Sequence, residues 1–326
     1  MDNTDELLFK FKEHLSILNR SPATIEAYME HAGHFLKSIT GNDIRQITTR
    51  MTEDYIAGLY DYRTIEGRPY KTATICLKVR SIKRLFEFLE KANIIFVDPT
   101  EFITEPRQEK GRIKPTLTSK EAGKILDQPN MGTLSGIRDR AILEVFYSTG
   151  IRLNELCALT IYDADLQGGM IRVNKGKGSK DRVVPLGKHA VKFLREYITK
   201  VRPVFTKKNR SNRRLFVDQY GKPISDQVVS IMIRTYSKAS KIKKQVTAHT
   251  FRHTFATVLI KNSADITAVQ KMMGHSDIKT TQGYLRSLGI DIKAVHKKTH
   301  PRERDRIKQE TARPKIERIK PPYERK

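Results

Sequence analysis

No stretch of the 326-residue sequence is apolar for long enough to cross a bilayer, which takes about 20 consecutive apolar residues. The opening stretch, MDNTDELLFKFKEH, is charged throughout and lacks the apolar core of a signal peptide. Both absences argue against a membrane-embedded or secreted protein. We therefore expect a soluble protein of the cytoplasm.

Cysteine is scarce as well. The two cysteines, Cys76 and Cys157, lie among apolar neighbours, and no Cys/His spacing suggests a zinc site. We interpret both as small buried hydrophobic side chains. His249 and His253 have the spacing of a zinc-binding helix, but Thr250 stands where a metalloprotease has glutamate. A structural, hydrogen-bonded His253 is the prediction that remains.

Signatures of several enzyme classes are also missing. The glycine-rich stretch NKGKGSKDR is not a Walker A loop, because no helix with Gly-Lys-Ser/Thr follows a strand there. The sequence shows no carboxylate cluster suited to Mg²⁺, and no Ser-His-Asp or Cys-His arrangement with a family-type local signature. Any chemistry must therefore come from other residue types.

Positive charge is what the sequence has in excess. Lysine and arginine number 62 against 36 aspartates and glutamates, which gives a formal net charge of +26. Such an excess favours a polyanionic partner. Nucleic acid is the first candidate, and an anionic membrane surface is a weaker second one.

The first hundred residues are predicted to be helical. The stretch RSPATIEAY offers Ser21 as an N-cap, with Pro22 at the first helical position. The clearest helix has an apolar stripe at steps of three and four residues, formed by Ile75, Val79, Ile82, Phe86 and Leu89. Its other faces carry four bases, Lys78, Arg80, Lys83 and Arg84. These bases form either a solvated helix face or a surface laid against phosphates, and the overall charge favours the second interpretation.

The remaining sequence mixes structure types. The stretch EPRQEKGRIKPTL has two prolines and no periodicity, which indicates a linker. RDRAILEVFYSTG predicts a helix ended by Gly150, while GMIRV and DRVVPL predict a β-hairpin with a basic, glycine-rich tip. The last thirty residues hold twelve lysines and arginines against five acidic residues, which indicates an extended or disordered tail. We predict a helical domain over residues 1–104, a linker over 105–117, a mixed α+β domain over 118–297 and a basic tail over 298–326.

Six groups of the second region together suit chemistry on a phosphodiester. Two guanidinium groups fit its non-bridging oxygens, and a lysine can protonate the departing sugar oxygen. A tyrosine, whose phenol pKa is near ~10, becomes a nucleophile where a base or a positive site stabilises the phenolate. Histidines can accept a proton or donate hydrogen bonds to the phosphate. The six groups are Arg152, Lys177, His249, Arg252, His275 and Tyr284.

The set suits metal-free phosphoryl transfer through a phosphotyrosine, so we expect no metal ion, no cofactor and no small-molecule substrate. Taken singly, the motifs are less informative. Arg152 and Glu155, three residues apart, are also typical of a surface ion pair, and the basic hairpin is also typical of a solvated turn.

In their order along the chain and in their local sequence, these stretches resemble the tyrosine recombinases, the phage integrase family. TGIRLNEL is similar to the first-arginine motif of the family, GKGSKDRVVPL to its hairpin lysine and HTFRH to its His-x-x-Arg-His motif. GHSDIKTTQGY is similar to the segment that leads to its nucleophile. The ordered combination is highly specific, although no single motif is. The resemblance extends more weakly over the helical first region.

The resemblance implies a nucleophile and a clamp. Tyr284 would attack the scissile phosphate and form a 3′-phosphotyrosyl link to DNA, while Arg152 and Arg252 would hold the non-bridging oxygens. Glu155 would orient the site rather than react. A 5′-hydroxyl of another strand would then attack the phosphotyrosine and rejoin the DNA.

The same resemblance implies the proton transfers. Lys177 would protonate the 5′-hydroxyl leaving group, and His249 would assist proton transfer at the tyrosine. His275 would donate a hydrogen bond to the phosphate. Bond energy would stay in the covalent intermediate, so neither ATP nor a metal ion would be required.

The implied fold is an all-α, SAM-like core-binding domain followed by a catalytic domain that is mainly helical with a small antiparallel sheet. The two domains would form a C-shaped clamp on double-stranded DNA, and four protomers would assemble on two sites, alone or with a paired recombinase. The segment SLGIDIKAVH would pack either on a neighbouring protomer or within its own domain.

Within the family the chain is most similar to the Xer recombinases, which lack an additional arm-binding domain. The stretch HKKTHPR resembles their ending. However, YDYRTIEGRPYK is longer than the corresponding Xer loop, and about two dozen residues follow the Xer-like ending. These departures leave two roles open, namely chromosome or plasmid dimer resolution and the integration or excision of a mobile element.

Two other functions are less consistent with the sequence. A DNA-binding clamp without catalysis predicts gaps in the set of six groups, and the sequence has none. A type IB topoisomerase uses related chemistry, but the Xer-like ending and the compact helical domain argue against it.

Overall fold

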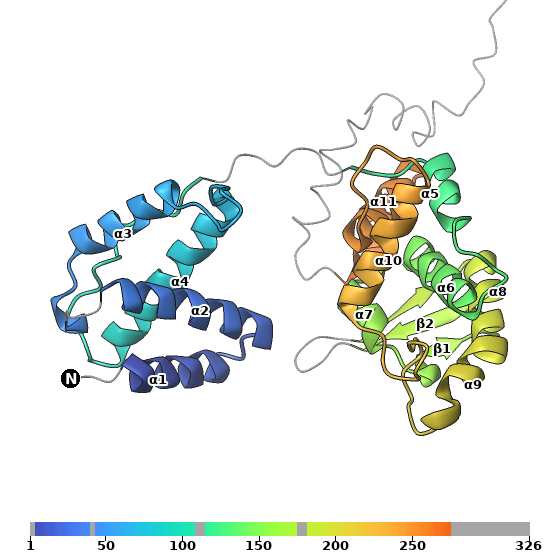
Figure 1. Ribbon diagram of the computed structural model, residues 1–326, viewed down its shortest axis with the longest axis horizontal. Helices are drawn as coiled ribbons and strands as arrows, with labels where there is room; N and C mark the ends of the chain where they lie inside the picture. The colour runs from blue at the N-terminus through green and yellow to red at the C-terminus, as the bar shows by residue number, and fades with distance from the viewer. Residues whose placement is uncertain (1–3, 40–42, 108–114, 175–180, 275–326) are drawn as a thin grey trace, which may run out of the picture. The chain divides into compact units, whose positions relative to one another are not determined.

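The computed structural model describes residues 4–39, 43–107, 115–174 and 181–274 (Figure 1). It divides the chain into two units, Met1–Arg112 and Ile113–Lys326, and each unit has hydrophobic clusters of its own. The four-part division expected from the sequence stays a prediction. Among the described helices, none is long and apolar enough to cross a membrane.

The first unit is a group of helices in which α2 packs against α1 and α4, and α4 also packs against α3 (Figure 1). Its elements are α1 (Thr4–Ile17), α2 (Pro22–Ser38), the 3₁₀ turn η1 (Ile44–Gln46), α3 (Thr49–Asp61) and α4 (Thr72–Lys91). As predicted, α2 begins with a proline behind an N-cap serine, and the Ser21 hydroxyl accepts a hydrogen bond from the Thr24 N–H at 3.2 Å. The predicted apolar stripe of α4 is buried in the core of the unit.

The four bases of α4 are used within the first unit. The Lys78 side chain is buried with its amine 5.0 Å from the centre of the Tyr70 ring, and this burial lowers its pKa. Lys83 donates hydrogen bonds to backbone carbonyls of the segment after α4, and Arg80 and Arg84 each pair with a glutamate. The interpretation of these bases as a surface laid against phosphates is therefore wrong for the buried Lys78, and it stays a prediction for the other three.

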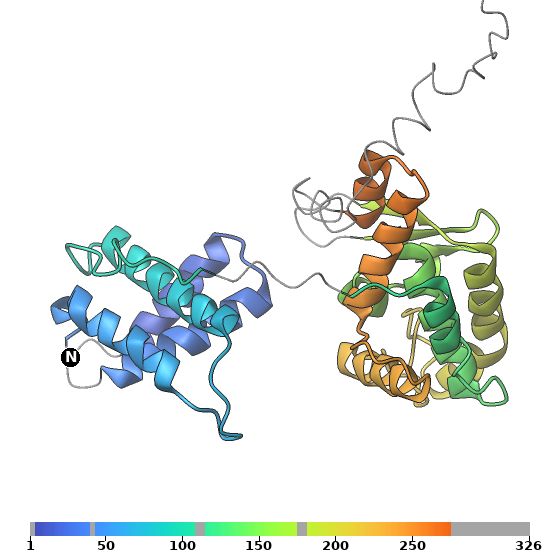
Figure 2. The ribbon, with the colours of Figure 1, turned by 90° about the horizontal axis from the view of Figure 1, so that it is seen from above.

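The stretch YDYRTIEGRPYK connects α3 and α4 and projects from the helices (Figure 2). Arg63 and Pro69 pair across it as an antiparallel bridge. The rings of Tyr62 and Tyr70 stack at 4.6 Å, while Ile65 between them is fully exposed. This connection therefore has a defined hairpin conformation of its own.

The second unit contains more helices and a three-stranded sheet. Its first elements are α5 (Ser119–Leu126), α6 (Leu134–Thr149), α7 (Leu153–Ala158), the 3₁₀ turn η2 (Ile161–Asp163), β1 (Ala164–Asp165), β2 (Met170–Val173) and β3 (Arg182–Pro185). A nearly continuous helical run follows, made of α8 (Lys188–Glu196), the π-helical turn η3 (Tyr197–Val201), α9 (Arg202–Phe205) and the 3₁₀ turn η4 (Thr206–Lys208). The last described elements are α10 (Asp226–Ala239), α11 (Ala248–Lys261) and α12 (Ile266–Met273).

Helix α6 is the centre of this unit, because it packs against α8, α11, α5 and β3 (Figure 1). Ten of its sixteen residues are buried. The strands form an antiparallel sheet in the order β1-β2-β3, with Ile171 opposite Val184. The predicted hairpin of β2 and β3 is present, and its glycine-rich tip lies outside the described residues. One face of β3 carries Arg182 and Val184 towards the interior.

Candidate active site

The site begins at the turn between α6 and α7. Gly150 ends α6 with a φ of 59°, the left-handed region in which glycine is favoured. A Cβ atom at this position would lie 2.5 Å from the Phe255 ring of α11, so a side chain has no room. Two residues later Arg152 occupies the N-cap position of α7, with extended backbone geometry. The glycine thus sets the direction in which the chain presents Arg152.

Glu155 binds two arginines at once. One carboxylate oxygen accepts the Arg152 backbone N–H, the other accepts the Arg152 Nη1 group, and both distances are 2.8 Å. Arg182 of β3 makes a bidentate contact with the same carboxylate at 3.0 and 2.7 Å. The Glu155 and Arg182 side chains are 12% and 8% exposed, whereas that of Arg152 is 42% exposed. The buried pair therefore supports an arginine that remains accessible.

The Glu155 carboxylate is kept ionised by its partners. Burial alone would raise the pKa of this group, but hydrogen bonds from Arg182 and from the Arg152 backbone, with the charge of Arg182, outweigh that effect. Together they lower the pKa to about 2. Glu155 is thus ionised near neutral pH, which suits it to orienting arginines and not to proton transfer.

Arg252 lies on the first turns of α11, where Thr247 caps the helix. It is buried, and its two terminal nitrogens donate to the carbonyls of Gly150 and Met273, both at 2.7 Å. The predicted face shared with His249 is present, but His249 is exposed while Arg252 is not. A guanidinium in this setting is fixed in position by backbone groups of two other elements.

The described members of the predicted set meet at one hollow of about 290 Å³. Arg152, His249 and Arg252 all line it, together with Ser230 of α10 and Thr247 before α11. The other three predicted residues, Lys177, His275 and Tyr284, lie outside the described residues. His253 is buried in α11 and does not line the hollow.

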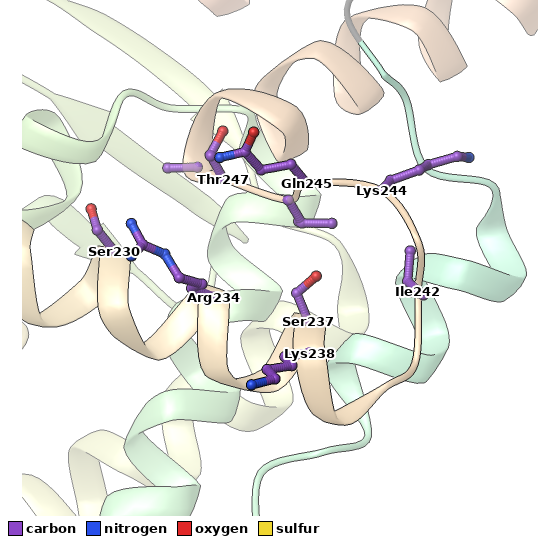
Figure 3. Close-up of a pocket in the computed structure, with 10 residues that line it drawn as sticks. Ser230, Arg234, Ser237, Lys238, Ile242, Lys244, Gln245 and Thr247 are labelled. Atoms are coloured by element: carbon purple, nitrogen blue, oxygen red, sulfur yellow. The ribbon is translucent and has the colours of Figure 1, made fainter. Parts of the chain in front are cut away.

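A second, basic hollow of about 410 Å³ adjoins the first and shares Ser230, Thr247 and Ala248 with it. Arg234 and Lys238 reach it from successive turns of α10, and Gln245 from the segment that leads into α11 (Figure 3). Among the described residues that line it, none is acidic. Three cations line it, of which Lys244 is paired with Glu121, while Arg234 and Lys238 lie on α10. Such a cluster next to the first hollow suits a second anionic group.

Residues 115–289 of the chain match the Phage integrase family. The chain belongs to this family.

Two relatives of this recombinase are tyrosine recombinases named XerD. The protein of Staphylococcus saprophyticus subsp. saprophyticus is 38% identical over 224 residues, which is 69% of this chain and 75% of the relative. The protein of Staphylococcus aureus (strain Mu50) is 34% identical over 285 residues, which is 86% of this chain and 94% of the relative.

Solved structures of recombinases are similar to this chain in fold. The XerA recombinase is 29% identical with a TM-score of 0.50, over 92% of this chain and 99% of that one. A lambda integrase dimer bound to a COC′ core site is 19% identical with a TM-score of 0.65, over 85% of this chain and 96% of that one. At that identity the likeness concerns the fold alone, and it confirms the predicted fold class.

The recombinase is an enzyme that cuts and rejoins DNA, and the predicted assignment to the Xer type is confirmed. The same findings favour it over a clamp protein without catalysis and over a type IB topoisomerase. The roles of the six residues stay predictions.

Sequence reasoning missed Arg182. The signal was present, because DRVVPL alternates and places an arginine on the same face of the strand as Val184, which is buried. A charged residue on the inner face of a strand needs a buried partner of opposite charge. Glu155 is that partner, although 27 positions separate the two in the sequence.

Proposed function

We propose that the recombinase cleaves DNA through Tyr284, with Arg152 and Arg252 holding the scissile phosphate. The observation that carries the proposal is the single hollow lined by both arginines and His249. Guanidinium groups fit phosphate oxygens with paired N–H donors, and they need no metal ion to balance the charge that develops there. Arg252 is buried, so its charge acts through a medium that screens it less than water does.

In this mechanism the phenol oxygen of Tyr284 bonds to phosphorus as the bond to the 5′-oxygen breaks. His249 assists removal of the phenolic proton, and Lys177 supplies the proton that the 5′-oxygen takes up. His275 donates a hydrogen bond to the phosphate. The reverse attack by a 5′-hydroxyl releases the tyrosine and rejoins the strand. The end of α12 supports this arrangement, because Arg152 binds the carbonyl of Gly274, the residue directly before His275 in the chain.

The substrate that we propose is a pair of double-stranded DNA sites held by four protomers, of this protein alone or with a paired recombinase. Solved relatives support the assembly, since lambda integrase has been seen as a tetramer bound to a Holliday junction and XerH bound to difH substrate. Dimer resolution on the chromosome or a plasmid, and integration or excision of a mobile element, are the two roles that fit. Either role places the protein on the nucleoid in the cytoplasm.

The test is covalent capture on DNA. Duplexes that carry the inverted repeats near the gene, nicked close to the expected cleavage point, are incubated with the protein and run on a denaturing gel. Wild type is expected to form a protein–DNA adduct and Tyr284→Phe none. Tyr220→Phe, an exposed tyrosine of the same unit, serves as the control that keeps the adduct.

A further variant tests the clamp. Arg152→Lys is expected to lower the adduct yield by about 10²–10³-fold, because one ammonium cannot replace a two-pronged donor at the developing charge. An adduct with Tyr284→Phe, or none with wild type on any repeat, contradicts the proposed function.

A further inference from the structure

The C-terminal end of α12 is tied down by arginines from three other elements. A helix leaves its last four carbonyls without intrahelical partners. In α12 the Gly274 N–H donates hydrogen bonds to the carbonyls of Gln270 and Lys271. The next three carbonyls, of Met272, Met273 and Gly274, each accept a hydrogen bond from a different arginine.

These contacts converge from distant parts of the chain. Arg182 of β3 donates through Nε to the Met272 carbonyl at 2.7 Å, and Arg252 of α11 donates to the next carbonyl at 2.7 Å. Arg152 at the start of α7 donates to the last one at 3.2 Å. Cations at a helix C-terminus also meet the negative end of the helix dipole. The predicted phosphate clamp and the end of α12 are therefore one hydrogen-bonded structure.

Arg182 differs from the other two arginines. Its side chain is 8% exposed and is absent from the residues that line the site hollow. Its three nitrogens bridge the Glu155 carboxylate to the Met272 carbonyl. Glu155 in turn holds the backbone and the guanidinium of Arg152. Arg182 thus links Arg152 to α12 without reaching the place where a phosphate would bind.

We propose that Arg182 is a positioning residue, which fixes the chain that leaves α12 against the arginine clamp. Met272 precedes His275 by three residues, so the position of its carbonyl limits where the following chain can start. The inference rests on the proposed function in one respect, since the following chain carries the predicted His275 and Tyr284. A shift of about 1 Å in such a start is enough to cost about 10²-fold in rate.

A purely structural arginine makes a different prediction, and the same unit contains one. Arg138 of α6 is also buried, and it also bridges a carboxylate, that of Asp139, to a backbone carbonyl, that of Val217. It lines neither hollow. Replacing either arginine by lysine removes the two-pronged contact and leaves the charge. Arg138→Lys is therefore a control for the loss of a buried two-pronged contact, because its carboxylate partner does not hold Arg152 and its carbonyl partner is not in α12.

The experiment compares single-turnover cleavage, DNA affinity and thermal stability for the two variants. Arg182→Lys is expected to cleave nicked duplex about 10²-fold more slowly than wild type, with unchanged affinity for that duplex. Arg138→Lys is expected to lose stability to a similar degree and to cleave at the rate of wild type. Equal cleavage by wild type and Arg182→Lys, or equal losses in the two variants, overturns the proposal.

Hydrogen exchange supplies a measurement that does not depend on cleavage. Arg182→Lys is expected to speed amide exchange in α12 while that of α6 stays as in wild type, and Arg138→Lys is expected to leave α12 protected. Unchanged protection of α12 in Arg182→Lys overturns the proposal, whether or not wild type cuts DNA. An absence of cutting by wild type contradicts the proposed function instead. Where Arg182→Lys does not fold, Glu155→Asp shortens the same link by one methylene, and the same separation of rate from affinity is expected.

Discussion

Glu155 is the residue on which the charge balance of the site depends. Its folded-state pKa of about 2 is below the ordinary value of 4.5, so ionisation stabilises the folded state. That contribution is complete above about pH 4.5 and is lost as the pH falls towards about 2. A difference of this size corresponds to about 3 kcal/mol.

We predict that Glu155→Gln removes this pH dependence. The free-energy difference of unfolding between wild type and the variant should be largest near neutral pH and should shrink by about 3 kcal/mol as the pH falls to about 2. Urea unfolding at a series of pH values measures it. The control is Glu196→Gln, whose pair with the exposed Lys200 should contribute about 0–1 kcal/mol. A difference that does not change with pH would show that Glu155 is not held as a buried anion.

At the residue scale, the sequence indicated which residues belong to the site better than it indicated which residues they contact. Arg152, His249 and Arg252 could be named because each stands in a short motif whose order along the chain is specific. Arg182 was missed, because the alternation of DRVVPL marks it as inward-facing but does not reveal its partner Glu155, which only the fold brings to it. Lys78 was misjudged for a similar reason, because a lysine at the edge of a helical stripe gives no sign that an aromatic ring will cover it.

At the scale of elements, local signals predicted individual helix ends. Ser21 caps α2 as expected, and Gly150 ends α6. The local sequence gives no such signal for the arginine contacts at the end of α12. Arg182 and Arg152 lie 90 or more positions away in the sequence from the carbonyls that they bind. Local sequence predicts where a helix stops but not what binds its last carbonyls.

Gly150 is the element boundary with the clearest consequence. We predict that Gly150→Ala destabilises the second unit by about 2 kcal/mol or more. The left-handed backbone alone accounts for about 1–2 kcal/mol, and overlap of the new methyl group with Phe255 adds to it. Because the Gly150 carbonyl holds Arg252, adduct formation on nicked DNA should fall as well. Urea unfolding followed by circular dichroism measures the first effect.

The matched control for this change is Gly123→Ala. Gly123 lies inside α5 of the same unit, and a Cβ atom there would meet nothing within 4 Å. Alanine should stabilise α5 by about 0.5–1 kcal/mol, because glycine loses more conformational freedom in a helix. If Gly150→Ala were as harmless as Gly123→Ala, the backbone at the start of the site would not be as constrained as its φ implies.

For the whole molecule, the excess of 26 positive charges is the dominant feature. A protein that neutralises several phosphates releases counterions, so its affinity for DNA falls steeply as salt is added. In the second unit the basic hollow beside the site adds Arg234 and Lys238 to the surface that such a ligand would meet. On the proposed function, these two bind backbone phosphates next to the scissile one.

We predict that Arg234→Gln reduces the slope of log affinity against log salt by about 1, and weakens binding to all duplexes alike, because one phosphate contact is lost without any base contact. Binding titrations at several salt concentrations measure both effects on any duplex, so no cognate site is needed. Arg210→Gln is the control, since Arg210 is an exposed arginine of the same unit that lines neither hollow. Equal slopes for Arg234→Gln and Arg210→Gln would mean that the DNA does not enter the basic hollow, and a flat salt response of wild type would remove the basis for a phosphate-binding surface altogether.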